Sequence, residues 1–564
     1  MPMPRAPAPA ASAPLGPKDA LAVGAVLLLG ALAYSSSLRG EFVFDDLVQI
    51  VDNPAIRDLG SFLGPSGYRM LPNRYVAYVT FALSYLAGGY DPFGWHLVNV
   101  VIHLANGVLV WALVVLAFRS PRLRSSALVP ASGAIAFASA ALFVSHPLAT
   151  QAVSYVVQRL TSLATFFYLL SVVLYLTWRV RRATPGRRSL YVGVLVSALL
   201  AFRTKEIAFT LPAALALVEW AFLDGGRRRW LPVLPVAALA LLIPLAVLDL
   251  GMQNSRAPVS AERSIRVPTP AGRHDYLRTQ AVVVTRYLGL LAVPVGQAVD
   301  HDVAIRRSWL ALDVAGSAFF LASLAAFGAW MAWRSTPRSG RPALDPSVRL
   351  VALGIGWFFL TLSVESSFVP IADVMNEHRA YLPSSALLPA AVTLLAILFR
   401  RVDPARVARD TAIAGGLAAS VLGVATWNRN LAWRNGETLW SDAAAKSPGH
   451  FRPVSNWGLL LARQRRYPEA ATVLRRGVEI DPRSAAARVQ LGVALFLGGR
   501  LEEAEVELRR AVALDPNDTD ALFNLSMFLR TTGRRPEARV YQERLRQVAT
   551  DPADRAWAEA ELAR

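Results

Sequence analysis

The sequence contains no cysteine. Disulfide bonds, thiol nucleophiles and cysteine-ligated metal sites are therefore excluded. Acidic residues are also scarce, with 40 Asp and Glu against 59 Lys and Arg and a formal net charge of +19. Nucleic-acid-binding proteins show such an excess, but here the arginines crowd into loops between apolar runs, where they set membrane orientation. We therefore expect no nucleic-acid partner.

Hydrophobic residues make up 54% of the chain and gather in long runs without charge. A run of about 20 apolar residues is long enough to cross a bilayer. The first 19 residues are rich in Pro and Ala, which predicts a disordered cytosolic tail at 1–19. The first apolar run lacks a small-residue cleavage site and is expected to be retained. We predict about eleven transmembrane helices, at 20–37, 94–118, 127–145, 150–178, 189–203, 206–223, 231–249, 309–333, 350–366, 382–400 and 409–427.

Arginines occupy alternate connections between these spans. They lie at Arg119, Arg122 and Arg124, at Arg179, Arg181, Arg182, Arg187 and Arg188, at Arg227 to Arg229, at Arg334, Arg338 and Arg341, and at Arg400, Arg401 and Arg406. The positive-inside rule places these loops and the N-terminus in the cytoplasm. The opposite connections are two long periplasmic loops, 38–93 and 250–308, and a short one at 367–381. We expect 276–297 to form an interfacial helix.

The C-terminal part is polar and repeats with a period of about 34 residues. Gly458 aligns with Gly492 and Pro482 with Pro516. This pattern is typical of tetratricopeptide repeats, in which small residues let paired helices pack closely. We predict an α-solenoid of about three repeats over 448–564, after a membrane domain at 20–447. The repeats would either bind another protein or serve as a stabilising or dimerising appendage.

Asp45 and Asp46 follow the first span, in the segment GEFVFDDLVQIVDNP. A carboxylate near the bilayer has a raised pKa and can act as a general base. The alternative is a helix cap or a turn.

Other polar residues gather at the outward ends of the spans, where ionisable groups are costly and suggest function. His96, Asn99 and His103 share one helix face, which indicates interhelical hydrogen bonds or catalysis. Lys205 and Glu206 are either an ion pair or ligands. An outward position argues against a transporter, whose site would lie near the midplane. The remaining candidates are Arg74, His146, Gln151, Gln158, Arg159, His301, Asp302, Asp373, Glu377, His378 and Arg379.

Five motifs together resemble the C-type glycosyltransferases, and most closely the transmembrane and tetratricopeptide-repeat containing protein O-mannosyltransferases and their bacterial relatives. The motifs are FVFDD, TFALSYLAGGYDPFGWHLVNVVIHLANG, HPLATQAVSYVVQR, TKEIAFTLP and DVMNEHRAYLP. The resemblance implies an all-α polytopic bundle in a bacterial inner membrane and a catalytic base at Asp45 or Asp46. Two positions depart from the pattern that the resemblance implies: Tyr75 stands where relatives usually have a proline, and Gln151 stands in place of an acid common in the eukaryotic members.

The resemblance implies an inverting glycosyltransferase that moves a sugar, such as mannose, from a polyprenyl phosphate to a hydroxyl of a periplasmic protein or envelope acceptor. Arginines suit the donor phosphate because they remain charged and bind it bidentately. Arg74, Arg159 and Arg379 are therefore the expected phosphate ligands, with Lys205 in reserve. No cofactor is expected, although Asp45 and Asp46 leave room for a divalent cation. The alternative is a membrane-anchored scaffold whose repeats recruit partners and whose spans are inert.

Overall fold

The structure is a computed structural model that describes residues 16–64, 73–181, 186–224, 226–249, 272–336, 342–367 and 369–563. Every regular element within these ranges is a helix, so the predicted all-α class is confirmed. The chain divides into two compact units. Unit 1 comprises residues 1–297 and 303–434, and unit 2 comprises 298–302 and 435–564. The sequence placed the domain boundary at 447/448.

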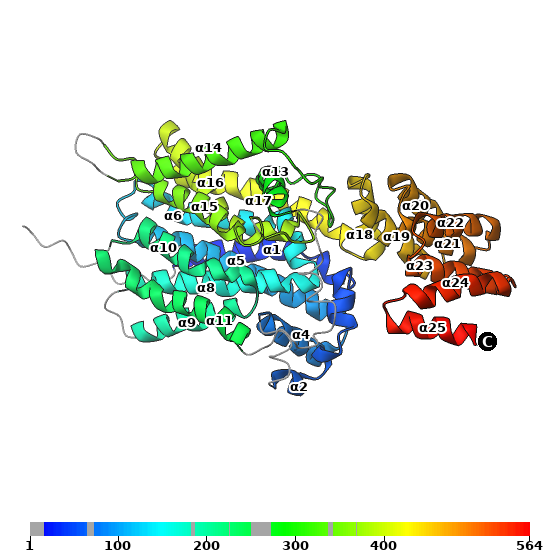
Figure 1. Cartoon of the computed structure of the whole chain (residues 1–564). Coiled ribbons are helices and arrows are strands. Elements are labelled where there is room, and N and C mark those ends of the chain that lie inside the picture. The colour runs from blue at the N-terminus through cyan, green and yellow to red at the C-terminus, as the bar shows by residue number, and fades with distance from the viewer. Residues whose placement is uncertain are drawn as a thin grey trace, which may run out of the picture. The chain divides into compact units, whose positions relative to one another are not determined.

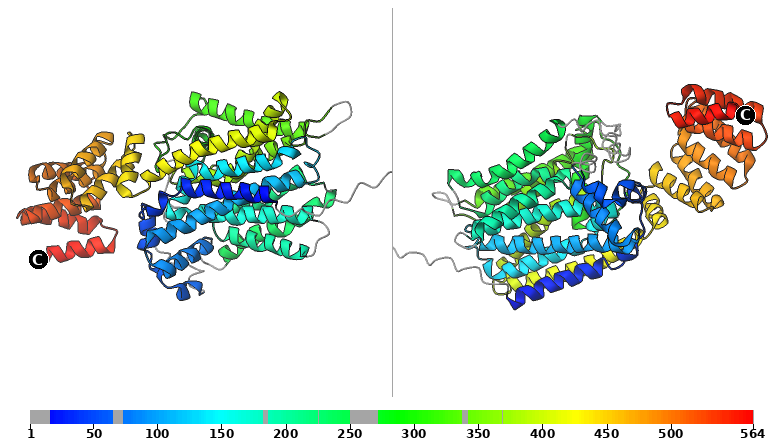
Figure 2. Two further views of the ribbon diagram at one scale, coloured as in Figure 1. Left: turned by 180° about the vertical axis from the view of Figure 1, so that it is seen from behind. Right: turned by 90° about the horizontal axis from the view of Figure 1, so that it is seen from below.

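The long helices of unit 1 run side by side in Figure 1 and in both views of Figure 2. They are α1 (Pro17–Ala33), α4 (Tyr75–Gly88), α5 (Pro92–Arg119), α6 (Ser132–Ser145), α8 (Arg159–Val180), α9 (Arg187–Phe202), α10 (Leu211–Phe222), α11 (Leu234–Asp249), α13 (Arg273–Ala292), α14 (Leu312–Arg334), α15 (Val348–Leu362), α16 (Tyr381–Val402) and α17 (Val407–Ala432). A helix lies at each predicted span. The first begins at Pro17, inside the predicted tail, and the Asp19 carboxylate accepts the Gly16 N–H at 3.2 Å. Residues 1–15 of that tail lie outside the described ranges.

Among the described residues, 5 helices are long and apolar enough to cross a membrane, or 6 if one bent pair forms a single span. The chain is thus a multi-pass membrane protein. The 5 are Pro92–Arg119, Val156–Val180, Leu312–Arg334, Glu377–Val402 and Val407–Ala432. Helices α1, α9, α10, α11 and α15 coincide with predicted spans but are shorter, so the count of eleven is not confirmed.

The segment between α6 and α8 corrects one predicted span. Residues 150–158 were assigned to a continuous helix that begins at 150, yet the chain forms three short pieces there, Pro147–Ala149, Thr150–Val153 (α7) and Val156–Gln158. His146 and Pro147 start this segment, and the axis bends by 51° between Val129–Ser145 and Pro147–Val153. We call residues 146–158 the broken segment.

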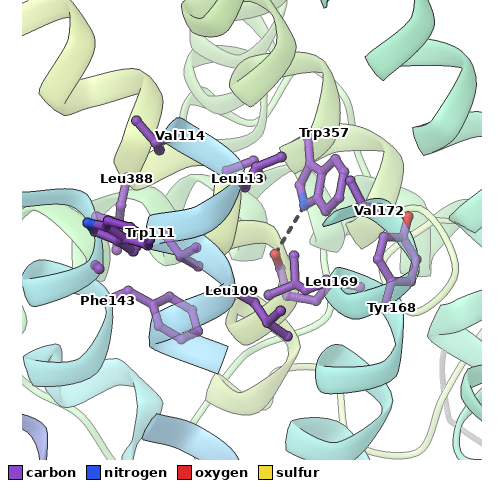
Figure 3. Close-up of a cluster of buried hydrophobic side chains, with 14 of the residues drawn as sticks. Leu109, Trp111, Leu113, Val114, Phe143, Tyr168, Leu169, Val172, Trp357 and Leu388 are labelled. Atoms are coloured by element: carbon purple, nitrogen blue, oxygen red, sulfur yellow. Dashed lines mark hydrogen bonds between the residues drawn. The ribbon is translucent and has the colours of Figure 1, made fainter. Parts of the chain in front are cut away.

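The core of unit 1 is aromatic and aliphatic, as Figure 3 shows for the cluster around Trp357 and Tyr168. The Trp357 indole N–H donates to the Leu382 carbonyl at 3.2 Å, which satisfies its only polar atom. Glycines let helices approach closely elsewhere. A Cβ built on Gly354 would lie 2.4 Å from the Ala386 carbonyl oxygen, so only glycine permits this contact between α15 and α16.

The arginine-rich loops meet at one end of the bundle. Arg179 pairs with buried Glu219 at 2.5 Å, and Arg122 pairs with Asp224 at 2.9 Å. Segments from the opposite set of connections also contact one another, since Lys205 pairs with Glu365 at 2.9 Å. Which membrane side each end faces remains a prediction from the positive-inside rule.

Reporter fusions test that orientation. A reporter joined after Arg188 should report the cytoplasm, because the surrounding loop is rich in arginine. A reporter joined after Trp440 should report the periplasm, because an odd number of spans separates the two positions. Equal signals from both fusions, measured with a paired cytoplasmic and periplasmic reporter, would contradict the span count.

Unit 2 consists of helix pairs. Its helices are α18 (Gly436–Lys446), α19 (Phe451–Arg463), α20 (Tyr467–Ile480), α21 (Ala485–Leu497), α22 (Leu501–Leu514), α23 (Thr519–Thr531), α24 (Arg535–Val548) and α25 (Pro552–Leu562). The repeated glycines allow close pairing, since a Cβ on Gly458 would lie 2.4 Å from Leu474 Cγ. Residues 298–302 join this unit through Asp300, whose carboxylate binds the Arg452 guanidinium at 2.5 and 2.6 Å.

Candidate active site

The acidic pair lies on a tight turn held against the broken segment. Asp46 is fully buried, and its two oxygens accept the Val157 N–H at 2.7 Å and the Val43 N–H at 3.2 Å. Phe44 has φ +54°, a conformation that is rare and strained for an aromatic residue. Asp45 is only partly buried. Asp46 is therefore an anchor of the turn, while Asp45 remains within reach of solvent and ligands.

Burial raises the pKa of Asp46 from 3.8 to about 8, and the neighbouring charge of Asp45 acts in the same direction. The backbone N–H groups oppose this shift because they favour the ionised carboxylate. The turn therefore holds two carboxyl groups in different surroundings, a pattern that separates the roles of paired acids.

This pKa gives a pH dependence of stability. The folded chain binds the Asp46 proton up to about pH 8 and the unfolded chain only to about pH 4, so the free energy of unfolding should fall as pH rises between these values. The Asp46→Asn variant should show a flatter dependence. Thermal unfolding of the detergent-purified chain at a series of pH values measures this, with the exposed Asp52→Asn as the matched control. Parallel curves for wild type and Asp46→Asn would contradict the assignment.

Two of the predicted basic ligands, Arg74 and Lys205, are each paired with a carboxylate. The Arg74 guanidinium is 3.6 Å from Glu206, and the Lys205 ammonium is 2.9 Å from Glu365. Lys205 also donates to the Thr161 hydroxyl at 3.0 Å. Of the two alternatives for Lys205 and Glu206, the structure does not show the ion pair between them; each pairs with a more distant residue, because extended backbone at Lys205 turns adjacent side chains apart.

A chain of pairwise electrostatic interactions links the acidic pair to these basic groups through Tyr78 and Glu365. Arg74 interacts with Tyr78 and with Glu365. Tyr78 also interacts with Asp45, and Glu365 interacts with Lys205. We refer to the following residues as the charged cluster: Asp45, Asp46, Arg74, Lys205, Glu206 and Glu365. The sequence did not single out Glu365, although an acid that directly follows an apolar run is a signal for it.

Arg159 is occupied by protein contacts. It is fully buried, and its Nε donates to Asn99 Oδ1 at 2.7 Å. Its Nη1 donates to the Ser84 hydroxyl at 2.9 Å and its Nη2 to the Trp95 carbonyl at 3.1 Å. Further contacts are the Thr80 carbonyl and the rings of Phe81 and Trp95. The geometry favours a clamp between α4, α5 and α8 over the predicted phosphate ligand.

The Arg379 guanidinium likewise binds backbone carbonyls of the loop that precedes it. Its Nη2 donates to the Asp373 carbonyl at 2.7 Å, and its Nη1 donates to the Val374 carbonyl at 3.2 Å and lies 3.4 Å from the Tyr276 hydroxyl. The guanidinium therefore holds residues 373–379 in shape and packs them against α13. This arrangement, too, favours a structural role over direct phosphate binding.

The other two residues of this motif contact the broken segment and the loop after α13. Gln151 Oε1 accepts the His378 backbone N–H at 2.8 Å and lies 3.2 Å from its Nδ1. Buried Glu377 accepts from the Gln297 amide at 3.2 Å. Gln151 thus fixes the backbone at His378.

The histidine stripe on α5 is buried between helices. His103 lies 2.6 Å from the Tyr381 hydroxyl and 3.1 Å from the Val144 carbonyl, which matches the interhelical alternative. His96 packs against the backbone at Gly40, where a Cβ would lie 3.1 Å from its Nε2.

His146 and Gln158, two of the predicted supporting residues, lie in the broken segment. His146 caps the first turn of the broken segment through Nδ1 and contacts the Leu291 carbonyl at 3.0 Å. Gln158 accepts from the Thr161 hydroxyl at 2.8 Å.

His301 and Asp302 belong to unit 2. The Asp302 N–H donates to the Ser447 hydroxyl at 3.3 Å. Their predicted support of the catalytic groups in unit 1 stays a prediction.

A small cavity in unit 1 does not include the acidic pair. Its lining residues are Phe143, His146, Leu148, Ala149, Leu291, Ala380, Tyr381 and Ser384. Among the described residues, no three His, Asp or Glu side chains gather as metal ligands.

The fold and the site together define a multi-pass α-helical membrane protein with a tetratricopeptide-repeat unit. Residues 455–519 match the tetratricopeptide-repeat family. Over 86% of its length the chain is 26% identical to Protein O-mannosyl-transferase Tmtc1 of Drosophila melanogaster, of which it covers 64%. It is 35% identical to human Protein O-mannosyl-transferase TMTC1, over 27% of this chain and 18% of that protein. The predicted resemblance to the O-mannosyltransferases of this type is confirmed.

The chain spans less than two thirds of the length of these relatives. Among solved structures, it is similar to ArnT from Cupriavidus metallidurans bound to undecaprenyl phosphate, with 14% identity, a TM-score of 0.38 and coverage of 79% of this chain and 80% of that one.

Proposed function

We propose that the chain is an inverting glycosyltransferase of a bacterial inner membrane, which transfers a sugar from a polyprenyl-phosphate donor to a hydroxyl acceptor. The observation that carries the proposal is the charged cluster, in which a partly exposed carboxylate, Asp45, shares an electrostatic network with Arg74 and Lys205. The names of the relatives support transfer of mannose to protein.

In the proposed reaction, the acceptor hydroxyl oxygen attacks the anomeric carbon while its proton passes to the Asp45 carboxylate. The bond from that carbon to the phosphate oxygen breaks, and its electron pair leaves with the phosphate. Attack opposite the leaving group inverts the anomeric centre. A positioned carboxylate accelerates such a proton transfer by about 10²–10⁴-fold.

Arg74 and Lys205 would stabilise the negative charge that develops on the leaving phosphate. Each is paired with a carboxylate, Glu206 and Glu365 respectively, which holds it in place before the donor binds. Lys205 is buried and also held by Thr161, so it would act as a fixed point charge. Arg159 and Arg379 would position the surrounding segments.

The donor class follows from the predicted location. Nucleotide sugars are absent outside the cytoplasm, so a site at the outward ends of the helices would draw its sugar from a lipid carrier. The acceptor would be a periplasmic protein or an envelope glycan, and the tetratricopeptide repeats would raise its local concentration. The competing function is a scaffold that uses only the repeats.

Purified full-length chain in nanodiscs, given radiolabelled polyprenyl-phosphate mannose and an envelope protein extract, tests the proposal. We expect labelled product whose anomeric configuration is opposite to that of the donor. Mass spectrometry of envelope proteins from cells with and without the chain should show the matching hexose. Absence of donor binding and of any glycan difference would favour the scaffold.

A further inference from the structure

Tyr155 of the broken segment contacts both Phe44 and Asp45 of the turn. Its ring stacks on Phe44, with centroids 5.9 Å apart and planes 14° apart. Its hydroxyl oxygen accepts the Asp45 backbone N–H at 3.0 Å. The same hydroxyl forms a hydrogen bond with the Asp45 side chain. Because a hydroxyl carries one donor and two lone pairs, it can accept from the backbone of Asp45 and donate to its carboxylate at once.

Tyr155 is itself held in place by burial and by a second aromatic ring. It is 2% exposed, and its other neighbour is Trp433, whose ring centroid lies 5.5 Å away at 29°. Two residues further along the chain, the Val157 N–H binds Asp46. Residues 155–157 therefore hold Phe44, Asp45 and Asp46 one after another, each by a different contact.

The conformation of Phe44 indicates that the turn needs these contacts with residues 155–157. A φ of +54° is unfavourable for an aromatic residue and persists only where surrounding contacts compensate it. Stacking on Tyr155 is such a contact. Relaxation of Phe44 to an ordinary φ would rotate the backbone at Asp45 and turn its carboxylate away from its present direction.

We propose that Tyr155 is the positioning residue for Asp45: its ring fixes the strained turn, and its hydroxyl orients the Asp45 carboxylate and keeps it ionised. This rests on the proposed function insofar as Asp45 is the base, but the contact itself is independent of which sugar is moved. A hydrogen bond donated to a carboxylate stabilises the ionised form, so its loss shifts protonation to higher pH.

The test uses the full-length chain in detergent and a water-soluble carbodiimide, which modifies carboxyl groups in their protonated form. Mass spectrometry of the labelled peptides gives the pH midpoint of modification for each acid separately. In Tyr155→Phe, which keeps the stacked ring, we expect the midpoint of Asp45 to rise by about one pH unit, the size expected for one lost charge-assisted hydrogen bond. Asp52, an exposed acid of the same loop, should keep its midpoint in the same digest.

The experiment also needs a control for the other titratable groups that act on Asp45. Asp46, Tyr78 and Tyr155 interact electrostatically with it. The matched variant Tyr85→Phe removes a hydroxyl from α4, whose Tyr85 ring contacts Tyr90 instead, and should leave the Asp45 midpoint unchanged. Replacement of Tyr155 by 3-fluorotyrosine, a stronger donor of the same shape, should lower the midpoint and does not depend on the folding of the Phe variant.

An unchanged Asp45 midpoint in both Tyr155→Phe and the fluorinated protein would overturn the proposal. A parallel assay with polyprenyl-phosphate mannose separates it from the proposed function. If the Asp45 midpoint shifts in the Tyr155 variants but the wild type transfers no sugar, the positioning role is retained and the proposed enzyme activity is rejected. If the wild type transfers sugar but the midpoint does not shift in the variants, the activity is retained and the positioning role is rejected.

Discussion

Replacing Asp45 by asparagine is expected to lower sugar-transfer turnover by about 10²–10⁴-fold, the usual loss when a general base is removed. The amide has nearly the same shape but cannot accept the acceptor's proton. Because Asp45 is partly exposed and its backbone N–H bond to the Tyr155 hydroxyl is kept in the variant, folding should survive. Initial rates at saturating donor, measured for purified wild type and variant, give the ratio.

Asp46→Asn is the informative comparison. Both Asp46 oxygens accept backbone N–H groups, so an amide would point one N–H donor at another. We expect that variant to lose stability and part of its turnover, while Asp52→Asn should behave as wild type. If Asp45→Asn retains nearly full turnover, the base lies elsewhere, and the buried Glu377 is the next carboxylate to test.

Much of the fold follows from the sequence because apolar runs and repeats are strong local signals. Each predicted span coincides with a helix, and the repeat period gave the helix pairs of unit 2. The acidic pair, Arg74 and Lys205 were found from polar residues placed against the apolar pattern. These signals need no knowledge of long-range packing.

The misses arise where packing overrides the local pattern. Residues 150–158 are apolar enough to read as the start of a span, yet they fold as short turns that deliver Tyr155 and Val157 to the acidic pair. Glu365 lies inside the predicted span 350–366 and was not singled out, whereas its contact with Lys205 joins residues 160 positions apart in the sequence. Composition cannot specify either partner.

The sequence also could not distinguish the roles of the three candidate arginines. Charge alone makes Arg74, Arg159 and Arg379 equivalent candidates for a phosphate. In the structure they differ, since Arg159 and Arg379 donate to protein groups and Arg74 faces a carboxylate at 3.6 Å. Only the acceptors around each guanidinium separate a ligand from a clamp.

Arg159→Met should therefore destabilise unit 1 rather than weaken donor binding alone. The substitution keeps much of the aliphatic volume, leaves the buried Asn99 Oδ1 without its donor and removes the hydrogen bonds to the Thr80 and Trp95 carbonyls. A buried acceptor left without its donor costs about 1–3 kcal/mol, and with the lost ring contacts we expect a total loss of roughly 3–5 kcal/mol, as for other buried charged groups removed from their partners. Thermal unfolding of the detergent-purified chain measures the loss.

Arg39→Met is the matched control, because Arg39 is an exposed arginine of the same unit and should be replaced without effect on stability. Arg159→Lys keeps the charge but cannot reach the acceptors on both α4 and α5 at once, so its thermal stability should be close to that of the Met variant. A phosphate ligand would give the opposite pattern: near-normal thermal stability in Arg159→Met, partial rescue by lysine, and a raised KM for the donor. That outcome would show that Arg159 binds the donor phosphate and does not mainly hold the helices together.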